Sequence, residues 1–124
     1  MEIHFTDREA DIMRVLWERG ASTVAEVRES LQDDLAYTTV LTILRTLQDK
    51  GYVGHEEEGR THRYYPLVEQ QAARKSALRH LADKLFDGSP ELLVTQLVSG
   101  EKLDREQIDR IRKLLDGKAG KGKS

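Results

Sequence analysis

The sequence predicts a mainly α-helical protein with one small β-hairpin, and three observations support this fold class. Apolar residues recur at helical spacing along most of the chain. Residues that begin and end helices divide these stretches into short segments. Residues 52–66 instead form two strand-like runs around a Glu-Gly pair. With 124 residues, 38% of them hydrophobic, the chain can bury a modest core and carry a further helical region.

Two short helices are expected at the start of the chain. Thr6 with Glu9, and Thr23 with Glu26, have the spacing of capping boxes, which begin helices. The first helix is expected to stop at Gly20 and the second at the polar residues 32–34. The apolar residues that these helices are expected to bury are Ala10, Met13, Leu16, Trp17, Val24, Val27 and Leu31.

Residues 37–50 form the third predicted helix, which ends where Gly51 can adopt a left-handed cap. Four apolar residues at positions i, i+3, i+4 and i+7 form one stripe that must face a core: Val40, Ile43, Leu44 and Leu47. The opposite face carries Thr38, Leu41, Thr42, Arg45 and Thr46. Threonine methyl groups and a forked cation suit base edges in a major groove. The alternative is an ordinary surface helix.

The hairpin follows the third helix without a linker. Tyr52 and Val53 begin the first strand, Glu58 and Gly59 make the turn, and residues 60–65 return until Pro66 closes the strand. Three helices followed by a hairpin are the sequence form of a winged helix-turn-helix. We therefore assign residues 1–66 to a winged helix-turn-helix DNA-binding domain.

The pattern of apolar residues in residues 67–117 predicts a C-terminal helical dimerisation region. Apolar residues mark a long helix up to Asp87-Gly88, Ser89-Pro90 starts a short one, and Asp104 begins the last. Such amphipathic helices need a partner, and a symmetric homodimer is the commonest solution. The expected contacts are Leu78, Leu81, Leu85, Leu93, Leu97 and Leu114. The alternative is a helical subdomain packed on its own winged helix, and the basic tail, residues 118–124, is expected to be disordered.

Four stretches of the chain resemble the BlaI/MecI/CopY family of penicillinase repressors, which are dimeric winged-helix transcriptional regulators. They are TDREADIMRVLWERG, AYTTVLTILRTLQDKGYV, GRTHRYYP and LVSGEKLDREQIDRIRKLL. The resemblance implies a repressor that binds a palindromic operator in double-stranded DNA as a homodimer and controls β-lactam resistance or a related stress response. It implies that the DNA-binding residues are Tyr37, Thr38, Thr39, Thr42, Arg45 and Thr46 on the third helix and Arg60, His62 and Arg63 on the wing.

The resemblance also implies how such a repressor is released. In the family, a membrane sensor-protease pathway triggered by β-lactam leads to cleavage in the C-terminal helical region. Alignment places the cleaved bond between Gln96 and Leu97, where the family's cleaved repressors have Asn-Phe, so this chain differs at both positions. The alternatives are that Leu97 is a core residue and that an effector releases the repressor without proteolysis.

The charge of the predicted winged domain is unfavourable for DNA binding through bulk attraction. Residues 1–66 hold eight Lys and Arg against thirteen Asp and Glu, a net charge of −5, whereas the rest carries +3. Binding must therefore depend on the local placement of Arg28, Arg45, Lys50, Arg60 and Arg63. The acidic run at residues 56–58 is either a solvated wing tip or a group of charges that repels DNA other than the operator. A protein-interaction module is the second class of function that we consider.

Composition excludes several other classes of protein. The chain has no Cys, which excludes disulfides, thiolate metal sites and the cysteine-based copper switch of one branch of the family. There is no apolar run for membrane insertion and no signal segment, so we expect a cytoplasmic protein. No catalytic residue set or phosphate loop is present, so we expect neither an enzyme nor a cofactor. His55 and His62 can approach each other on the wing, but the four scattered histidines predict no metal site.

Overall fold

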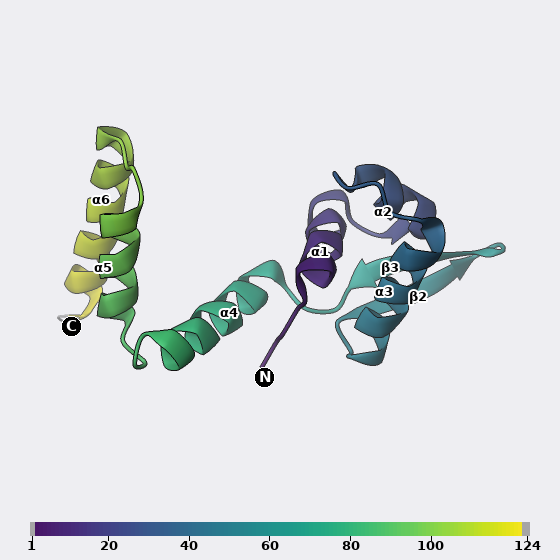
Figure 1. The fold of residues 1–124 in the computed structure, drawn as a ribbon, viewed down its shortest axis with the longest axis horizontal. Coiled ribbons are helices and arrows are strands. Elements are labelled where there is room, and N and C mark those ends of the chain that lie inside the picture. The colour runs from purple at the N-terminus through teal and green to yellow at the C-terminus, as the bar shows by residue number, and fades with distance from the viewer. Residues whose placement is uncertain (1, 123–124) are drawn as a thin grey trace. The chain divides into compact units, whose positions relative to one another are not determined.

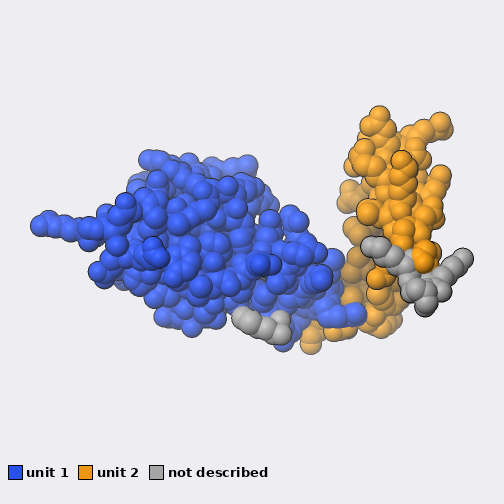
Figure 2. All heavy atoms as spheres, turned by 180° about the vertical axis from the view of Figure 1, so that it is seen from behind, with its two compact units in different colours: residues 1–80 blue, residues 81–124 orange. Residues whose placement is uncertain are grey.

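The computed structural model describes residues 2–122, and Figure 1 shows the fold. The elements are α1 (Asp7–Arg19), β1 (Ser22–Thr23), α2 (Val24–Ser30), α3 (Tyr37–Asp49), β2 (Val53–Glu58), β3 (Thr61–Pro66), α4 (Gln70–Leu85), α5 (Pro90–Gly100) and α6 (Arg105–Gly122). The mainly helical fold class with a small β-wing is confirmed. The chain divides into two compact units, residues 1–80 and 81–124, which Figure 2 colours separately. This division falls within α4, whereas the boundary expected at 66/67 marks the end of the sheet.

Both predicted capping boxes are present. Thr6 N donates to Glu9 Oε1 at 2.8 Å while Glu9 N donates to Thr6 Oγ1 at 3.2 Å. Thr23 and Glu26 repeat the arrangement at 2.9 and 3.2 Å. Helix α1 ends at Gly20, whose φ of 87° is in the left-handed region that glycine tolerates.

The predicted inner face of α1 was wrong in one respect, because Ala10 is exposed. Ile12 and Val15, which were not predicted, are buried beside Met13 and Leu16. The methyl group of an alanine offers little area to bury, so the larger residues at neighbouring positions fix the rotation of the helix toward the core.

The sheet has three antiparallel strands in the order β1-β3-β2. Strand β1 was not predicted, because its two residues gain their pairing only from distant partners: Ser22 lies opposite Tyr64 and Thr23 opposite Arg63. Gly59 and Arg60 form the two-residue turn between Glu58 and Thr61, and Gly59 has φ 65°. The sequence had placed Arg60 at the start of the second strand. In the structure Arg60 lies in the turn, and β3 begins at Thr61.

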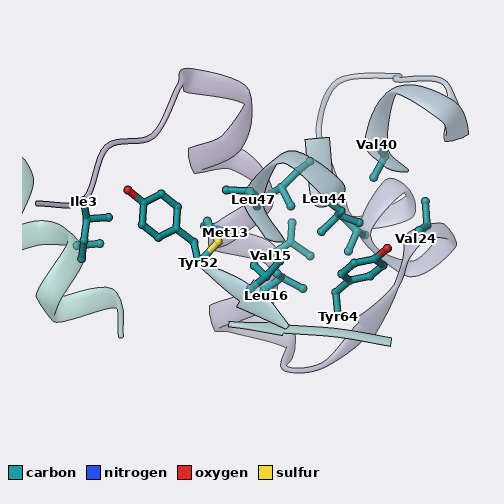
Figure 3. Close-up of a cluster of buried hydrophobic side chains, with 14 residues drawn as sticks. Ile3, Met13, Val15, Leu16, Val24, Val40, Leu44, Leu47, Tyr52 and Tyr64 are labelled. Carbon is teal, nitrogen blue, oxygen red and sulfur yellow. The ribbon is translucent and has the colours of Figure 1, made fainter. Parts of the chain in front are cut away.

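The core joins α1, α2 and α3 to the sheet (Figure 3). Helix α3 contributes Val40, Leu44 and Leu47, each fully buried, as its apolar spacing predicted. Ile43 is only partly buried. The complete buried cluster is Ile3, Ile12, Met13, Val15, Leu16, Val24, Val27, Val40, Leu44, Leu47, Tyr52, Val53, Tyr64 and Ala73.

The first part of α4 packs on the winged helix. Ala73 belongs to the buried cluster, and Trp17 Nε1 donates to the carbonyl oxygen of Val68 at 2.9 Å. Ile3 N donates to Ser76 Oγ at 2.8 Å, so the segment before α1 also lies against α4. These contacts explain why the first compact unit extends beyond the sheet into this helix.

In the second unit, α5 and α6 begin at the predicted caps. Ser89 Oγ accepts from Leu92 N at 3.2 Å, and Asp104 Oδ1 accepts from Gln107 N at 2.8 Å. Helix α6 continues to Gly122, so residues 118–122 of the predicted disordered tail are helical, while residues 123–124 lie outside the described residues. No helix within residues 2–122 is both long and apolar enough to cross a bilayer.

Candidate nucleic-acid interface

The predicted recognition face of α3 is solvent-exposed, as it must be to meet DNA. This holds for all six predicted helix residues: Tyr37, Thr38, Thr39, Thr42, Arg45 and Thr46. The buried stripe on the other side of α3 fixes the rotation of the helix, because Val40, Leu44 and Leu47 anchor it in the core. The same packing therefore presents the polar face outward.

The threonine hydroxyls on this face are bound to the helix itself. Thr42 Oγ1 donates to the carbonyl oxygen of Thr38 at 2.9 Å, and Thr46 Oγ1 donates to that of Thr42 at 3.0 Å. A hydroxyl whose proton is used in this way keeps its acceptor lone pairs and its methyl group for a ligand. This face can therefore accept from a base amino group or touch a thymine methyl.

A groove of about 230 Å³ brings the recognition helix and the wing together. Tyr37 and Arg45 of α3 line one side, and Arg60 and His62 of the hairpin line the other. Its remaining lining residues are Val24, Leu41, Thr61 and Tyr64. Leu41, which the sequence had placed on the outward face, is partly buried against the core.

Tyr64 anchors the middle of β3 beneath this groove. It is 1% exposed, and burial raises the pKa of its hydroxyl despite the opposing positive charge of Arg45. Burial thus reinforces the neutral state that a tyrosine hydroxyl already has at neutral pH.

The two wing histidines stack on the same face of the hairpin. The imidazole centroids of His55 and His62 are 4.3 Å apart with an interplanar angle of 13°. His55 Nδ1 lies 2.7 Å from Gln48 Oε1 of α3, and Glu57 Oε1 lies 3.8 Å from His62 Nε2. His62 is thus positioned by a chain of contacts that begins on α3. The sequence had indicated that the two histidines could approach each other on the wing, but it gave no signal for the contact with Gln48.

Arg63 lies on the opposite face of β3 and is bound by two carboxylates. Its Nε donates to Glu58 Oε2 at 2.6 Å, and Nη1 donates to Glu26 Oε1 at 2.9 Å and to the carbonyl oxygen of Ala21 at 3.1 Å. The backbone hydrogen bond of Thr23 and the nearby guanidinium groups hold the pKa of Glu26 below its usual value. Arg63 therefore connects the wing to α2, and a phosphate would have to compete with these carboxylates.

Two further cations of the winged unit have structural partners. Lys50 Nζ donates to both carboxylate oxygens of the buried Glu9, at 2.9 and 2.8 Å. Arg28 Nε donates to the carbonyl oxygen of Leu35 at 2.7 Å. Within residues 2–122, Arg45 and Arg60 make no ion pair, so these two guanidinium groups are available to phosphates or bases at the groove.

The predicted dimer contacts lie mostly at the surface of the single chain. The exposed fractions are 54% for Leu78, 39% for Leu81, 74% for Leu85, 54% for Leu97 and 74% for Leu114. Leu93 is intermediate. Gln96 and Leu97 both lie within α5 and are exposed, so the interpretation of Leu97 as a core residue was wrong for the single chain. Local apolar patterning cannot distinguish a core from an uncovered face.

Comparison with known proteins gives one consistent result. The family model described as penicillinase repressor matches residues 5–117. The methicillin resistance regulatory protein MecI of Staphylococcus aureus (strain N315) is 24% identical over 112 residues, which cover 89% of this chain and 91% of MecI. The transcriptional regulator BlaI of Mycobacterium tuberculosis (strain ATCC 25618 / H37Rv) is 33% identical over 113 residues, which cover 88% of this chain and 80% of BlaI.

Solved structures agree with these relatives. The solution structure of the DNA-binding domain of the repressor BlaI is 28% identical with a TM-score of 0.51, and it covers 56% of this chain and 90% of that domain. The transcriptional regulator Tm0710 from Thermotoga maritima, at 16% identity, has a TM-score of 0.55 and covers 93% of this chain and 74% of its own. At that identity the likeness supports the winged-helix fold alone.

Proposed function

Since this chain belongs to the penicillinase repressor family, and is therefore a DNA-binding transcriptional repressor and not an enzyme, we propose that it binds a palindromic operator as a homodimer. The observation that carries this proposal is the groove in which Tyr37 and Arg45 of α3 face Arg60 and His62 of the wing. A helix that enters the major groove brings such a wing against the neighbouring backbone.

Base recognition is assigned to the middle of α3. Arg45 carries an unpaired guanidinium, which can bind the O6 and N7 atoms of guanine with two hydrogen bonds. Thr42 and Thr46 add methyl groups and acceptor oxygens beside it. Together these residues would distinguish thymine and guanine from the other bases.

The start of α3 is assigned to the phosphate backbone. Ala36 provides no side-chain cap, so the first turn, with Tyr37, Thr38 and Thr39, offers its backbone N–H groups to an anion. A phosphate bound there would fix the register of the helix in the groove, as backbone contacts generally do.

The wing is assigned to phosphates outside the major groove. Arg60 at the turn and His62 on β3 would contact them directly, while Arg63 would either exchange its carboxylate partners for a phosphate or hold the wing against α2. Because residues 1–66 carry a net charge of −5, such local contacts must supply the attraction. Binding to unrelated DNA should accordingly be weak.

The homodimer is supported by exposed apolar residues on α4, α5 and α6. Leu78, Leu81, Leu85, Leu97 and Leu114 are all at least 39% exposed, and exposed large apolar side chains in such numbers are typical of an interaction surface. A second copy of the chain is the partner that the family resemblance suggests. Two-fold symmetry would present two recognition helices to half-sites one DNA turn, about 34 Å, or a multiple apart.

Control of β-lactam resistance or a related stress response in the cytoplasm is also part of the proposal. Its support is the naming of the relatives, among them a methicillin resistance regulator and the penicillinase repressor of Bacillus licheniformis. We further propose inactivation through a membrane sensor-protease pathway that cuts between Gln96 and Leu97. Both residues are exposed on α5, but a protease needs an extended substrate, so this helix must first unwind. Release by an effector without cleavage is the alternative.

The test is a gel-shift titration with the protein's own upstream promoter fragment, in the presence of excess unrelated DNA. We expect a specific shift that Arg45→Ala weakens by roughly 1 to 3 kcal/mol with a changed base preference. Arg14→Ala removes the same charge from α1, outside the groove, and should leave the shift nearly intact. Equal binding by Arg45→Ala and the parent chain would contradict the assignment of α3. A failure of the parent chain to shift the fragment would favour a protein-interaction module.

A further inference from the structure

The segment before α1 is held in an extended position against α4. Ile3 is 6% exposed and belongs to the core cluster, Ile3 N donates to Ser76 Oγ at 2.8 Å, and His4 N donates to the hydroxyl of Tyr52 at 3.1 Å. Side chains alternate along an extended chain, so Glu2 and His4 share the side away from the buried Ile3. His80 lies one helical turn after Ser76 on the same face of α4.

These three side chains converge at one point. His4 Nε2 lies 3.1 Å and His80 Nδ1 lies 3.4 Å from the same oxygen, Oε1 of Glu2. The two imidazole rings meet edge to face, with centroids 4.6 Å apart and an interplanar angle of 83°. All three candidate ligand atoms lie within 4.8 Å of one another.

The spacing fits a small transition-metal ion. Around a tetrahedral Zn²⁺ with bonds of about 2.0 to 2.1 Å, neighbouring ligand atoms are about 3.3 Å apart. The two distances from Glu2 match that edge. The remaining distance, between His4 Nε2 and His80 Nδ1, would shorten to this value with a small rotation of the His4 ring. That rotation is open to His4, because its side chain is 52% exposed while its backbone is held by Tyr52.

We propose that Glu2, His4 and His80 form a binding site for a divalent cation of the zinc type, shared between the N-terminal segment and α4. Two imidazoles and one carboxylate are a donor set that Zn²⁺ accepts, with water in the fourth position. The ligands are partly exposed, so the ion exchanges with solvent and occupies the site according to its concentration. Bound ion links residues 2–4 to α4 and stabilises their packing.

No metal site was predicted from the sequence, because the three ligands lie far apart along the chain. Glu2 and His4 are separated from His80 by most of the winged helix, so no ligand-spacing motif exists. The proposal is independent of the DNA-binding assignment, because none of the three residues lines the groove at α3. The competing explanation is that Glu2 only accepts hydrogen bonds from the two imidazoles.

The test uses the untagged full-length protein after removal of metal with a chelator. Zn²⁺ is titrated by calorimetry, and Co²⁺ serves as a visible-absorption probe of tetrahedral coordination. We expect one ion per chain, a raised midpoint of thermal unfolding, and binding weakened by roughly tenfold or more in Glu2→Gln, His4→Ala and His80→Ala. Circular dichroism checks that each variant is folded, which the partial exposure of these side chains favours.

The matched control is the double variant His55→Ala/His62→Ala, which removes the other histidine pair of the chain and should leave Zn²⁺ binding unchanged. Binding that survives His80→Ala would place the ion on the N-terminal segment alone and overturn the proposal. Loss of Zn²⁺ binding in the double variant His55→Ala/His62→Ala would place the ion on the hairpin and would also overturn the proposal. If neither Zn²⁺ nor Co²⁺ binds the parent chain, the cluster is a hydrogen-bonded group only.

Discussion

The two compact units differ in how they cover their apolar residues. Residues 1–80 enclose a continuous cluster that includes Leu16, Leu44 and Tyr64. Among residues 81–120, whose side chains the structure describes, Ala82 is the only buried one. Yet α5, in the second unit, is strongly apolar by sequence, with three leucines and two valines in eleven residues. The difference teaches that the winged helix is stabilised within one chain, whereas the C-terminal helices lack cover from their own chain.

The largest expected effect comes from introducing charge at exposed leucines of the second unit. Leu85→Asp combined with Leu97→Asp should convert the proposed dimer into a monomer, because each buried leucine would contribute about 1.5 to 3 kcal/mol. Operator affinity should then fall by roughly 10²- to 10⁴-fold as the two-site advantage is lost. Sedimentation velocity and gel shift measure the two effects. Leu67→Asp is the control, since Leu67 is also exposed but belongs to the first unit. A double variant that remains a dimer would place the interface elsewhere.

Leu44→Ala tests the other side of the comparison. Removing a fully buried leucine should lower the free energy of unfolding by about 2 to 5 kcal/mol. The loss should be nearly independent of protein concentration, because the cluster lies within one chain. Urea unfolding at several concentrations checks this. Thr39→Ala, on the exposed face of the same helix, should change stability by no more than about 0.5 kcal/mol, and a comparable loss there would mean that α3 packs differently.

The ion pair between the buried Glu9 and the partly solvated Lys50 should make the winged unit sensitive to acid. Burial opposes ionisation of Glu9, but hydrogen bonds from Lys50 and Thr6 outweigh it and hold the pKa of its carboxyl below the ordinary value of a glutamate. The stabilisation is therefore complete above the unfolded-state pKa and is lost as the pH falls through the lower folded-state pKa.

Glu9→Gln should remove about 1 to 3 kcal/mol at neutral pH, since the pair is broken but Lys50 is partly solvated. Its stability should then vary less than that of the parent chain between pH 6 and about pH 3.5. Unfolding curves across this range decide the matter. Parallel pH profiles for the two proteins would show that the pair does not set the acid response.

The smallest effects are expected on the wing. Arg60→Ala should reduce the slope of binding against salt by about 1 and leave base preference unchanged. Arg63→Ala should weaken all DNA sequences alike. If Arg63 acts by holding the wing to Glu26 and Glu58, its salt slope should equal that of the parent chain. A slope reduced as in Arg60→Ala would instead indicate a direct phosphate contact.

Local signals predicted the winged helix well. The capping boxes of Thr6 and Thr23 and the left-handed Gly51 that follows the end of α3 depend on residues close in sequence, and all three were found. Strand β1 depends on pairing with Tyr64 and Arg63, which lie about forty residues away, so no local pattern indicated it. The helical spacing of apolar residues in α3 predicted which of its side chains are exposed. The carboxylate partners of Arg63 could not be predicted in this way, because tertiary packing brings them together.

The same limit applies to residues that serve two purposes. Glu9 was predicted from its capping box, yet its buried carboxylate also accepts from Lys50, which is 41 positions away. In the C-terminal helices the pattern of apolar residues was clear, but the pattern alone could not say whether the chain covers them. The helical extent of α6 was also underestimated, because glycines such as Gly117 and Gly120 lower helix propensity and had indicated a disordered tail.

The position of Trp17 has a spectroscopic consequence. It is the single tryptophan of the chain, so indole fluorescence reports one site only. Its N–H donates to the carbonyl oxygen of Val68, just before α4, and its ring lies 6.1 Å from that of Phe5. Any event that lifts the start of α4 from the winged helix must break this bond and expose the indole to water. A red shift of its emission would then time that movement in the unlabelled protein, whether DNA, metal or proteolysis is the trigger.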